Sequence, residues 1–225
     1  IDFTGGVNGQ SPQGSLMEVN GKLYGTTYSG GAQNGGTFFE YDISSGVLTK
    51  KQDLTNTNPL GTPLLASNGK IYGSTTYGGT NLSGTIYEYN PGTSTYTVKA
   101  NIDDVGLNYG VGALVEVSPG KLLGITTGGG TSGYGGVFEY DIATSILTKK
   151  FDFSSALGHA SLNSSSFVIA GDGKLFGQLP YGGNADAGVL YTFEIATNTY
   201  TKLFGFDLDD RVFGPRDFVE TSSNR

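Results

Sequence analysis

Tyrosine and asparagine side chains recur in the glycine-rich segments of this sequence, where they could bind a ligand. The tyrosines are Tyr28, Tyr77, Tyr109, Tyr134 and Tyr181, and the asparagines are Asn34, Asn81, Asn108 and Asn184. A tyrosine ring can stack on a sugar ring or fill an apolar pocket of a partner, and an amide beside it can bond to hydroxyl groups. The same rings could instead pack between repeated units of the fold, and the absence of Trp weakens a sugar-binding interpretation.

Two acidic segments carry oxygen ligands of the kind that Ca²⁺ prefers. One contains Asp103 and Asp104, and the other contains Asp207, Asp209 and Asp210. Closely spaced carboxylates on a loop suit calcium, but "DLDD" does not follow the spacing of an EF-hand loop and Arg211 comes directly after it. A solvated acidic rim is the alternative that we favour, and no cofactor is expected apart from this weak calcium candidate.

Three glutamates could supply a pair of catalytic carboxylates. Glu18, Glu116 and Glu220 occupy equivalent places in a repeated pattern, and a glycoside hydrolase needs two carboxyl groups beside the scissile bond. The sequence holds one histidine, His159, and no cysteine, and it shows no nucleophile–base pair, zinc-ligand spacing or phosphate-binding loop. We therefore expect no enzymatic activity, solvated glutamates and a solvent-exposed His159. A polysaccharide-active enzyme is kept as an alternative.

These residues are carried by four copies of one pattern of about 50 residues. The glycine before a recurring lysine stands at Gly21, Gly69, Gly120 and Gly173, with spacings of 48, 51 and 53 residues. A strand-like segment with the same spacings reads "FFEYD" from Phe38, "IYEYN" from Ile86, "VFEYD" from Val137 and "LYTFE" from Leu190. Because two separate motifs recur with the same spacings, the chain has a repeat architecture.

Each copy contains four short strand candidates, a to d, and lacks a helical period. The links from a to b are "NG", "NG", "PG" and "DG", of which Asn-Gly and Asp-Gly are strong two-residue hairpin signals. Four hairpin-linked strands in a repeated unit are typical of a β-propeller blade. We therefore predict an all-β propeller of four-stranded antiparallel blades in a single domain, 1–225. Its complete blades are expected at about 14–54, 62–102, 112–153 and 165–206.

Partial strands are expected at both ends of the chain. Residues 1–3, "IDF", resemble the end of a strand d, and residues 216–221 resemble a strand a. We expect a fragment of a longer repeat protein, with further blades or a partner chain at the open ends, since exposed strand edges and blade faces need covering. A compact ring closed by the two end strands is the alternative.

The connectivity of a blade brings the long loops to one face. The a–b and c–d links are short. The b–c loops (25–37, 73–85, 124–136 and 177–189) and the d–a loops (4–13, 54–61, 103–111, 154–164 and 207–215) are long. Binding sites concentrate on loops that a rigid scaffold holds, so the candidate residues are expected there. Recurring lysines and glutamates should form cross-strand ion pairs; they are Lys22, Lys70, Lys121, Lys174, Glu40, Glu88 and Glu139.

The segment 3–42, "FTGGVNGQSPQGSLMEVNGKLYGTTYSGGAQNGGTFFEYD", resembles the GloVer tandem repeat of Gloeobacter and Verrucomicrobia. The resemblance covers nearly the whole chain. It weakens in the third copy, where Leu123 replaces a tyrosine, and in the fourth, where the loop reads "GQLPYGGNADAG". It implies a bacterial protein that is extracellular or on the outer cell surface, and it supplies no activity or catalytic residues.

Composition narrows the range of partners. The net charge is −7, and the 13 Lys and Arg residues are scattered, so no basic stripe is present to bind nucleic acid. No apolar run approaches the roughly 20 residues of a membrane span, so direct membrane insertion is not expected. We expect a non-enzymatic recognition or adhesion module that binds a glycan or a surface protein through the long-loop face. The alternative is a structural spacer or secreted cargo domain without a ligand.

Overall fold

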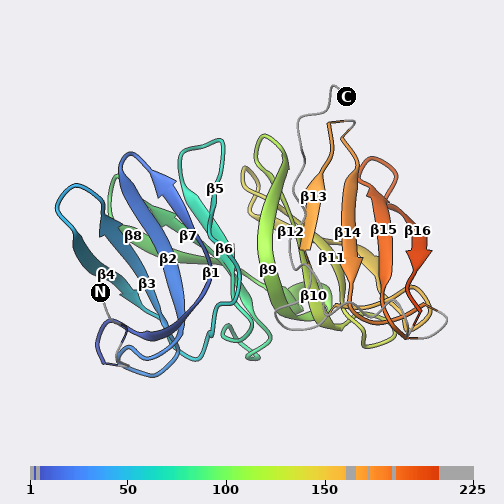
Figure 1. Cartoon of the computed structure of the whole chain (residues 1–225), viewed down its shortest axis with the longest axis horizontal. Coiled ribbons are helices and arrows are strands. Elements are labelled where there is room, and N and C mark those ends of the chain that lie inside the picture. Colours follow the sequence, from blue (N-terminus) through green and yellow to red (C-terminus); the bar gives the residue numbers. More distant parts are fainter. Residues whose placement is uncertain (1–2, 4–5, 161–165, 172, 184–185, 208–225) are drawn as a thin grey trace.

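The chain folds into four antiparallel sheets of four strands each, arranged as blades (Figure 1). The structure is a computed structural model that describes residues 3, 6–160, 166–171, 173–183 and 186–207. Within every sheet the strands are ordered as they follow along the chain, so each blade is an up-and-down meander. The predicted all-β architecture of four-stranded blades is confirmed.

The strands have the following bounds. Blade 1 contains β1 (Gln10–Val19), β2 (Lys22–Ser29), β3 (Thr37–Asp42) and β4 (Val47–Asp53). Blade 2 contains β5 (Leu64–Leu65), β6 (Ile71–Ser74), β7 (Thr85–Asn90) and β8 (Thr95–Asn101). Blade 3 contains β9 (Leu107–Ser118), β10 (Lys121–Gly129), β11 (Gly136–Asp141) and β12 (Ile146–Asp152). Blade 4 contains β13 (Ser166–Ile169), β14 (Leu175–Leu179), β15 (Val189–Glu194) and β16 (Thr199–Gly205).

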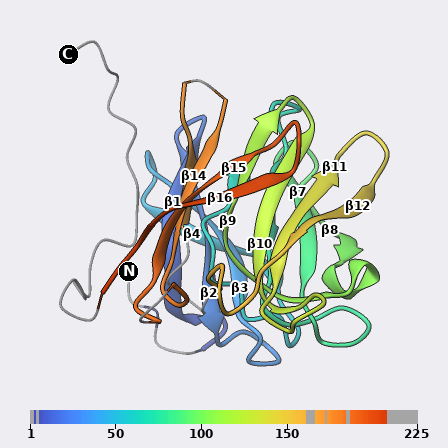
Figure 2. The ribbon, with the colours of Figure 1, turned by 90° about the vertical axis from the view of Figure 1, so that its right-hand side faces the viewer.

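The blades form a curved row that does not close into a ring. Blades 1 and 4 stand at opposite ends in Figure 1. In Figure 2, seen from the blade 4 end, both lie on the left while blades 2 and 3 are displaced to the right. The first strands of successive blades contact one another along the row, β1 with β5, β5 with β9 and β9 with β13. The alternative of a compact closed ring is therefore wrong. The expected partial strand at 216–221 and residues 1–2 lie outside the described residues.

Two first strands are longer than the sequence predicts. β1 begins at Gln10 and β9 at Leu107, so parts of the expected loops 4–13 and 103–111 are strand. The second strands of blades 1 and 3 are also long and give the first strands a partner. Gln10 pairs with Ser29, and Asn108 pairs with Gly128. One turn of 3₁₀-helix, η1 (Ile102–Val105), lies where a loop was expected. Among the described residues, no helix has the length and apolar character of a membrane span.

Each blade carries an apolar row on both of its faces, and we name these faces by the neighbouring blade that they face at the seams. The front face packs on the preceding blade and the back face on the following one. At the seam between blades 1 and 2, the back-face ring of Phe38 lies 4.7 Å from the front-face ring of Tyr89. At the next seam Tyr72 meets Tyr140 with ring centroids 6.5 Å apart. At the last seam Phe151 stacks on Tyr200 at 5.0 Å. Aromatic packing across the seams therefore forms the core.

A glycine in the second strand of each blade makes room for a front-face ring. The glycines are Gly25, Gly73, Gly124 and Gly177, and their cross-strand partners are Phe39, Tyr87, Phe138 and Tyr191. A Cβ at Gly124 would lie 2.3 Å from the Phe138 ring, closer than carbon atoms can approach. The ring therefore covers the glycine, and the repeated glycine is a packing requirement.

The recurring lysines and glutamates form the expected ion pairs in two blades. Lys22 Nζ lies 2.7 Å from Glu40 Oε1, and Lys70 Nζ lies 2.8 Å from Glu88 Oε1. The other carboxylate oxygen of Glu40 accepts a hydrogen bond from the Tyr24 hydroxyl at 2.8 Å, and Tyr72 bonds to Glu88 in the same way at 2.6 Å.

The prediction of an ion pair between Lys121 and Glu139 in blade 3 is wrong. Lys121 instead contacts Asp141 at 2.5 Å, the residue directly opposite in the strand register. Leu123 takes the place of the tyrosine and offers no hydroxyl group to the glutamate. Glu139 lies 3.8 Å from Lys150. In blade 4, Thr192 replaces the glutamate, and its hydroxyl group donates to the carbonyl oxygen of Leu175 at 3.0 Å.

Replacing Gly124 with alanine should lower the free energy of unfolding by roughly 1–3 kcal/mol, because the added methyl group overlaps the Phe138 ring. The matched control is Gly6→Ala, since a Cβ at Gly6 meets no atom within 4 Å. Urea unfolding of both variants measures the effect. Equal midpoints for the two variants would contradict this packing role.

Glu40→Gln should weaken the dependence of stability on pH under acidic conditions. Burial alone would raise the pKa of Glu40, but the hydrogen bonds from Lys22 and Tyr24 and the charge of Lys51 outweigh it and lower the pKa. A carboxyl group with a depressed pKa stabilises the fold above its unfolded pKa, and this contribution is lost as the pH falls through the folded pKa. The Tm difference between wild type and variant should therefore shrink as the pH drops below about 4.5, the ordinary value for Glu.

The control for this prediction is Asp104→Asn, which removes an exposed carboxylate. Its Tm difference from wild type should change little over the same pH range. A Tm difference for Glu40→Gln that stays constant with pH would count against the stabilising role assigned to the Glu40 carboxylate.

Candidate functional site

The long loops meet along one face of the curved row, at the lower edge of Figure 1. With the strands as observed, the b–c loops span 30–36, 75–84, 130–135 and 180–188. Backbone hydrogen bonds tie each of them to the neighbouring d–a loop. Gly31 N donates to Gly6 O at 3.2 Å, and Gly130 N donates to Gly106 O at 2.7 Å. The b–c loops and the d–a loops therefore form one continuous surface.

The double glycines of these loops serve the close contact between loops. Gly129 has a φ of +78°, and a Cβ on it would lie 2.6 Å from the carbonyl oxygen of Gly106. Gly182 has a φ of +93°, and its Cβ would lie 2.2 Å from the Cα of Gly158. Glycine alone tolerates both the left-handed backbone and such an approach. These glycines are architectural and not ligands.

Four of the predicted candidate residues meet at the seam between blades 2 and 3. The rings of Tyr77 and Tyr109 are in edge-to-face contact, with centroids 5.6 Å apart and planes at 68°. In the same pair of loops, Asn81 Nδ2 donates a hydrogen bond to Asp103 Oδ2. Tyr109 is 40% exposed and Tyr77 is half-buried, so an aromatic surface faces solvent in the loops that also carry this amide and carboxylate.

Tyr109 adopts a backbone conformation that is unusual for its residue type. Its φ is +61°, in the left-handed region that costs a bulky residue roughly 1–2 kcal/mol. Its backbone N–H donates to the carbonyl oxygen of Ser83 at 2.6 Å, which links blade 3 to the b–c loop of blade 2. Strained residues of this kind concentrate at functional sites, and the inference from strain to function is a hypothesis.

A second aromatic group occupies the seam between blades 3 and 4. The His159 ring lies between Tyr134, at 4.7 Å, and Tyr181, at 4.8 Å and nearly parallel. His159 N also donates to the carbonyl oxygen of Tyr181 at 3.3 Å. The expectation of a solvent-exposed histidine is wrong, because the side chain is half-buried between two rings. Sequence reasoning could not find this stack, since the pairing of the d–a loop with the b–c loop determines it.

The other candidates have contacts within the fold. Tyr28 lies in β2 and packs against the core cluster between blades 3 and 4. Asn34 Oδ1 accepts a hydrogen bond from Gly30 N at 2.9 Å and so holds its own loop. Asn108 is half-buried in β9. Asn184 lies outside the described residues.

The structure describes three of the five calcium candidates, which are Asp103, Asp104 and Asp207. Asp103 is bonded to Asn81, and Asp104 is an exposed neighbour in η1. Within the described part of the chain, no three His, Cys, Asp or Glu side chains come together in a way that could hold a metal ion. Asp207 is the last described residue, and Asp209 and Asp210 lie outside that part.

The glutamates considered as a catalytic pair hold turns. Glu18 Oε1 accepts from Gly21 N at 2.6 Å. Glu116 accepts from Gly120 N at 2.7 Å and from the backbone and hydroxyl group of Ser67 at 2.8 and 2.7 Å. Burial would raise the pKa of Glu116, but these hydrogen bonds outweigh it and lower the pKa. Glu116 therefore ties blade 3 to blade 2 at the hairpin end, and Glu220 lies outside the described residues.

Two solved structures share this fold. TolB from Acinetobacter baumannii aligns with a TM-score of 0.55 at 15% sequence identity, over 89% of this chain and 44% of that chain. A chain of a nidogen/laminin complex aligns with a TM-score of 0.55 at 16% identity, over 87% of this chain and 65% of that chain. The chain thus spans less than two thirds of either structure's length, and identities this low show a likeness of fold alone.

Sequence comparisons place the chain in a family. No curated protein sequence matches it. The family model of the Gloeobacter/Verrucomicrobia repeat matches residues 1–117 and, in a second overlapping alignment, residues 51–224. These alignments cover nearly the whole chain and confirm the resemblance seen in its repeated motifs. The chain belongs to the Gloeobacter/Verrucomicrobia repeat family.

Proposed function

We propose that this chain is a non-enzymatic recognition module of the bacterial cell surface that binds a glycan at the seam between blades 2 and 3. The observation that supports this best is the contact of half-buried Tyr77 with exposed Tyr109, in the same loops as the hydrogen bond from Asn81 to Asp103. These residues come from two different blades and the loops around them, so the seam creates the site. The surface location rests on the family resemblance.

The chemistry of this group suits a sugar. A tyrosine ring offers an apolar face to the C–H groups of a pyranose while its hydroxyl group remains hydrated. Asn81 and Asp103 orient each other, and each keeps further hydrogen-bonding capacity, because an amide has two N–H donors and a carboxylate has two oxygens. An amide and a carboxylate in the same loops as an aromatic face supply hydrogen-bonding groups for sugar hydroxyls.

The stack of Tyr134, His159 and Tyr181 offers a related surface at the next seam. Tyr181 is 41% exposed. Repeated weak sites on one rigid face strengthen the binding of a repetitive polymer, since the second contact becomes intramolecular. A polysaccharide is therefore a better fit than a monosaccharide.

A protein ligand is the second candidate. One of the structures that shares this fold belongs to a nidogen/laminin complex, so a related arrangement of blades takes part in a protein–protein complex. The tyrosine-rich loops would serve such a partner equally well.

Tyr77→Ala and Tyr109→Ala should each weaken glycan binding about tenfold, or roughly 1.4 kcal/mol, because each removes half of the aromatic surface. A glycan array identifies the ligand, and calorimetric titration of the best one measures the affinities. The control is Ile146→Ala, which truncates a 58% exposed side chain at the opposite end of blade 3. If the chain binds no glycan on the array and no surface protein in a pull-down, a spacer without a ligand would be favoured.

Tyr109→Gly should leave the free energy of unfolding unchanged or raise it, while it weakens glycan binding about as much as Tyr109→Ala does. Glycine relieves the left-handed strain of roughly 1–2 kcal/mol, which offsets the lost contacts of an exposed ring. Tyr28→Ala is the comparison, since its half-buried ring packs on the core and its loss should destabilise the fold. Chemical denaturation measures both. Destabilisation by Tyr109→Gly as large as that by Tyr28→Ala would show that Tyr109 is held for packing.

A further inference from the structure

Four asparagines are followed directly by glycine, and they are Asn8, Asn20, Asn34 and Asn68. Such a pair can react with itself. The backbone nitrogen of the glycine attacks the side-chain amide carbon, closes a succinimide ring and expels ammonia. Glycine favours this reaction because it has no Cβ to obstruct the approach. The backbone nitrogen is a poor nucleophile until it loses its proton, so a base held against that N–H would determine which pair reacts.

The pair of Asn20 and Gly21 has such a base. It forms the hairpin turn between β1 and β2, and both residues are exposed. Gly21 N donates a hydrogen bond to Glu18 Oε1 at 2.6 Å. This distance is within the reach of a general base, roughly 2.6–3.2 Å. The Asn20 side chain forms no hydrogen bond with the described residues, so it can turn toward the nitrogen.

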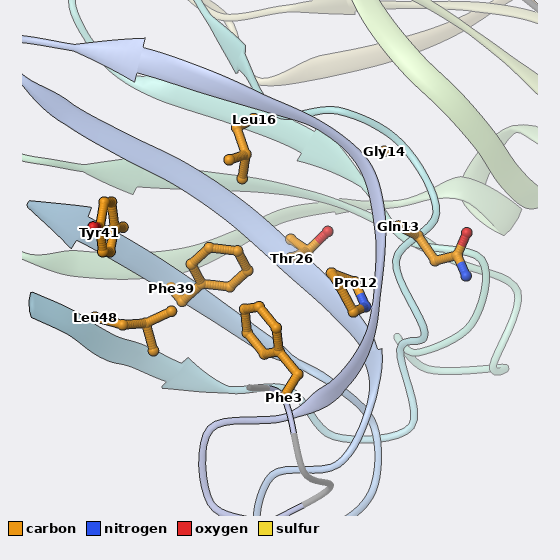
Figure 3. Close-up of a pocket in the computed structure, with 9 residues that line it drawn as sticks. All are labelled: Phe3, Pro12, Gln13, Gly14, Leu16, Thr26, Phe39, Tyr41 and Leu48. Atoms are coloured by element: carbon orange, nitrogen blue, oxygen red, sulfur yellow. The ribbon is translucent and has the colours of Figure 1, made fainter. Parts of the chain in front are cut away.

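The pairing of β1 with β2 holds Glu18 in this position. Glu18 lies opposite Leu23 in the antiparallel register. Two residues earlier, the Leu16 side chain lies against Gly25 of β2 together with the ring of Phe39 (Figure 3). The end of β1 that carries the carboxylate is therefore fixed on β2, and the Glu18 side chain reaches only across its own hairpin turn.

The hairpin of blade 2 carries the same pair without the base. Gly69 N donates to the carbonyl oxygen of Ala66 at 2.9 Å, and a carbonyl oxygen is a far weaker base than a carboxylate. The side-chain amide of Asn68 is held at both ends. Its Nδ2 donates to the Tyr72 hydroxyl group at 3.0 Å, and its Oδ1 accepts from Lys70 N at 3.1 Å. Ring closure would have to break both hydrogen bonds.

The glycines of the other two pairs are buried in the long-loop face. Gly9 is buried, and its N–H donates to a backbone carbonyl oxygen at 3.1 Å. Gly35 is also buried, and the amide before it is bound, because Asn34 Oδ1 accepts from Gly30 N at 2.9 Å. Within the described part of the chain, no carboxylate contacts either glycine N–H.

Blade 3 has the base without the asparagine. Glu116 Oε1 accepts a hydrogen bond from Gly120 N at 2.7 Å. The residue before that glycine is Pro119, which has no side-chain amide. Among the hairpins that the structure describes in full, only that of blade 1 combines an asparagine with a carboxylate on the glycine N–H.

We propose that Asn20 is a site of self-catalysed deamidation, with Glu18 as the general base. Glu18 takes the proton from Gly21 N while that nitrogen forms a bond to Cγ of Asn20. The bond from Cγ to Nδ2 then breaks, and the proton on Glu18 leaves with Nδ2 as ammonia. Water opens the ring at either carbonyl group, so the products are aspartate and isoaspartate. The new carboxylate lies at the opposite end of the blade from the long loops, so the proposal does not depend on glycan binding.

Incubation of the whole chain at neutral pH, followed by peptide mass mapping, tests this assignment. Asn20 should deamidate at least about tenfold faster than Asn68, because a positioned general base contributes a factor of this size or larger. Glu18→Gln keeps a hydrogen-bond acceptor at the turn but removes the base. It should slow the reaction at Asn20 about tenfold or more and leave the rates at Asn8 and Asn34 unchanged.

Glu116→Gln is the matched control in the hairpin of blade 3 and should leave the rate at Asn20 unchanged. Thermal unfolding confirms that both variants are folded. In urea, Asn20 and Asn68 should deamidate at similar rates, because Glu18 is then no longer held against Gly21 N. An unchanged rate at Asn20 in the Glu18→Gln variant overturns the proposal. So does a rate at Asn68 of the folded chain that equals the rate at Asn20.

Discussion

The structure depends on one constraint, which is that a four-stranded blade must bury both of its faces. Side chains alternate between the two sides of a strand, so apolar residues on both sides leave a blade unstable by itself. Rings such as Phe38 and Tyr89, or Phe151 and Tyr200, satisfy the constraint by packing across a seam. The stacking of blades follows from it, as does the glycine beneath each front-face ring.

The long-loop face is a consequence of the same packing. The b–c loop of a blade lies against the d–a loop that leads into the same blade, and this close approach requires glycines such as Gly129 and Gly182. Side chains that are distant in sequence then become neighbours. The b–c loop also reaches the segment that leads into the next blade, where Tyr77 meets Tyr109 and Tyr134 meets His159. The packing of the blades is thus sufficient to bring the side chains of a candidate binding site together at a seam.

The polar groups in the seams differ between blades. Thr192 and Leu203 of blade 4 stand where Glu40 and Lys51 form an ion pair in blade 1. The internal seams tolerate buried carboxylates because lysines and tyrosines bind them. In blade 4 the hydroxyl group of Thr192 donates to the carbonyl oxygen of Leu175 instead.

The repeated sequence by itself determined the strands, the hairpins, the four blades and the ion pairs of Glu40 and Glu88, because these depend on contacts within about 20 residues of chain. It did not reveal the extended β9, the partner of Lys121 or the position of His159 between two rings. It also could not separate Tyr28, which packs on the core, from Tyr109, which faces solvent. Those outcomes were decided by the tertiary structure, because register at the seams and packing between blades depend on segments that lie a whole repeat apart.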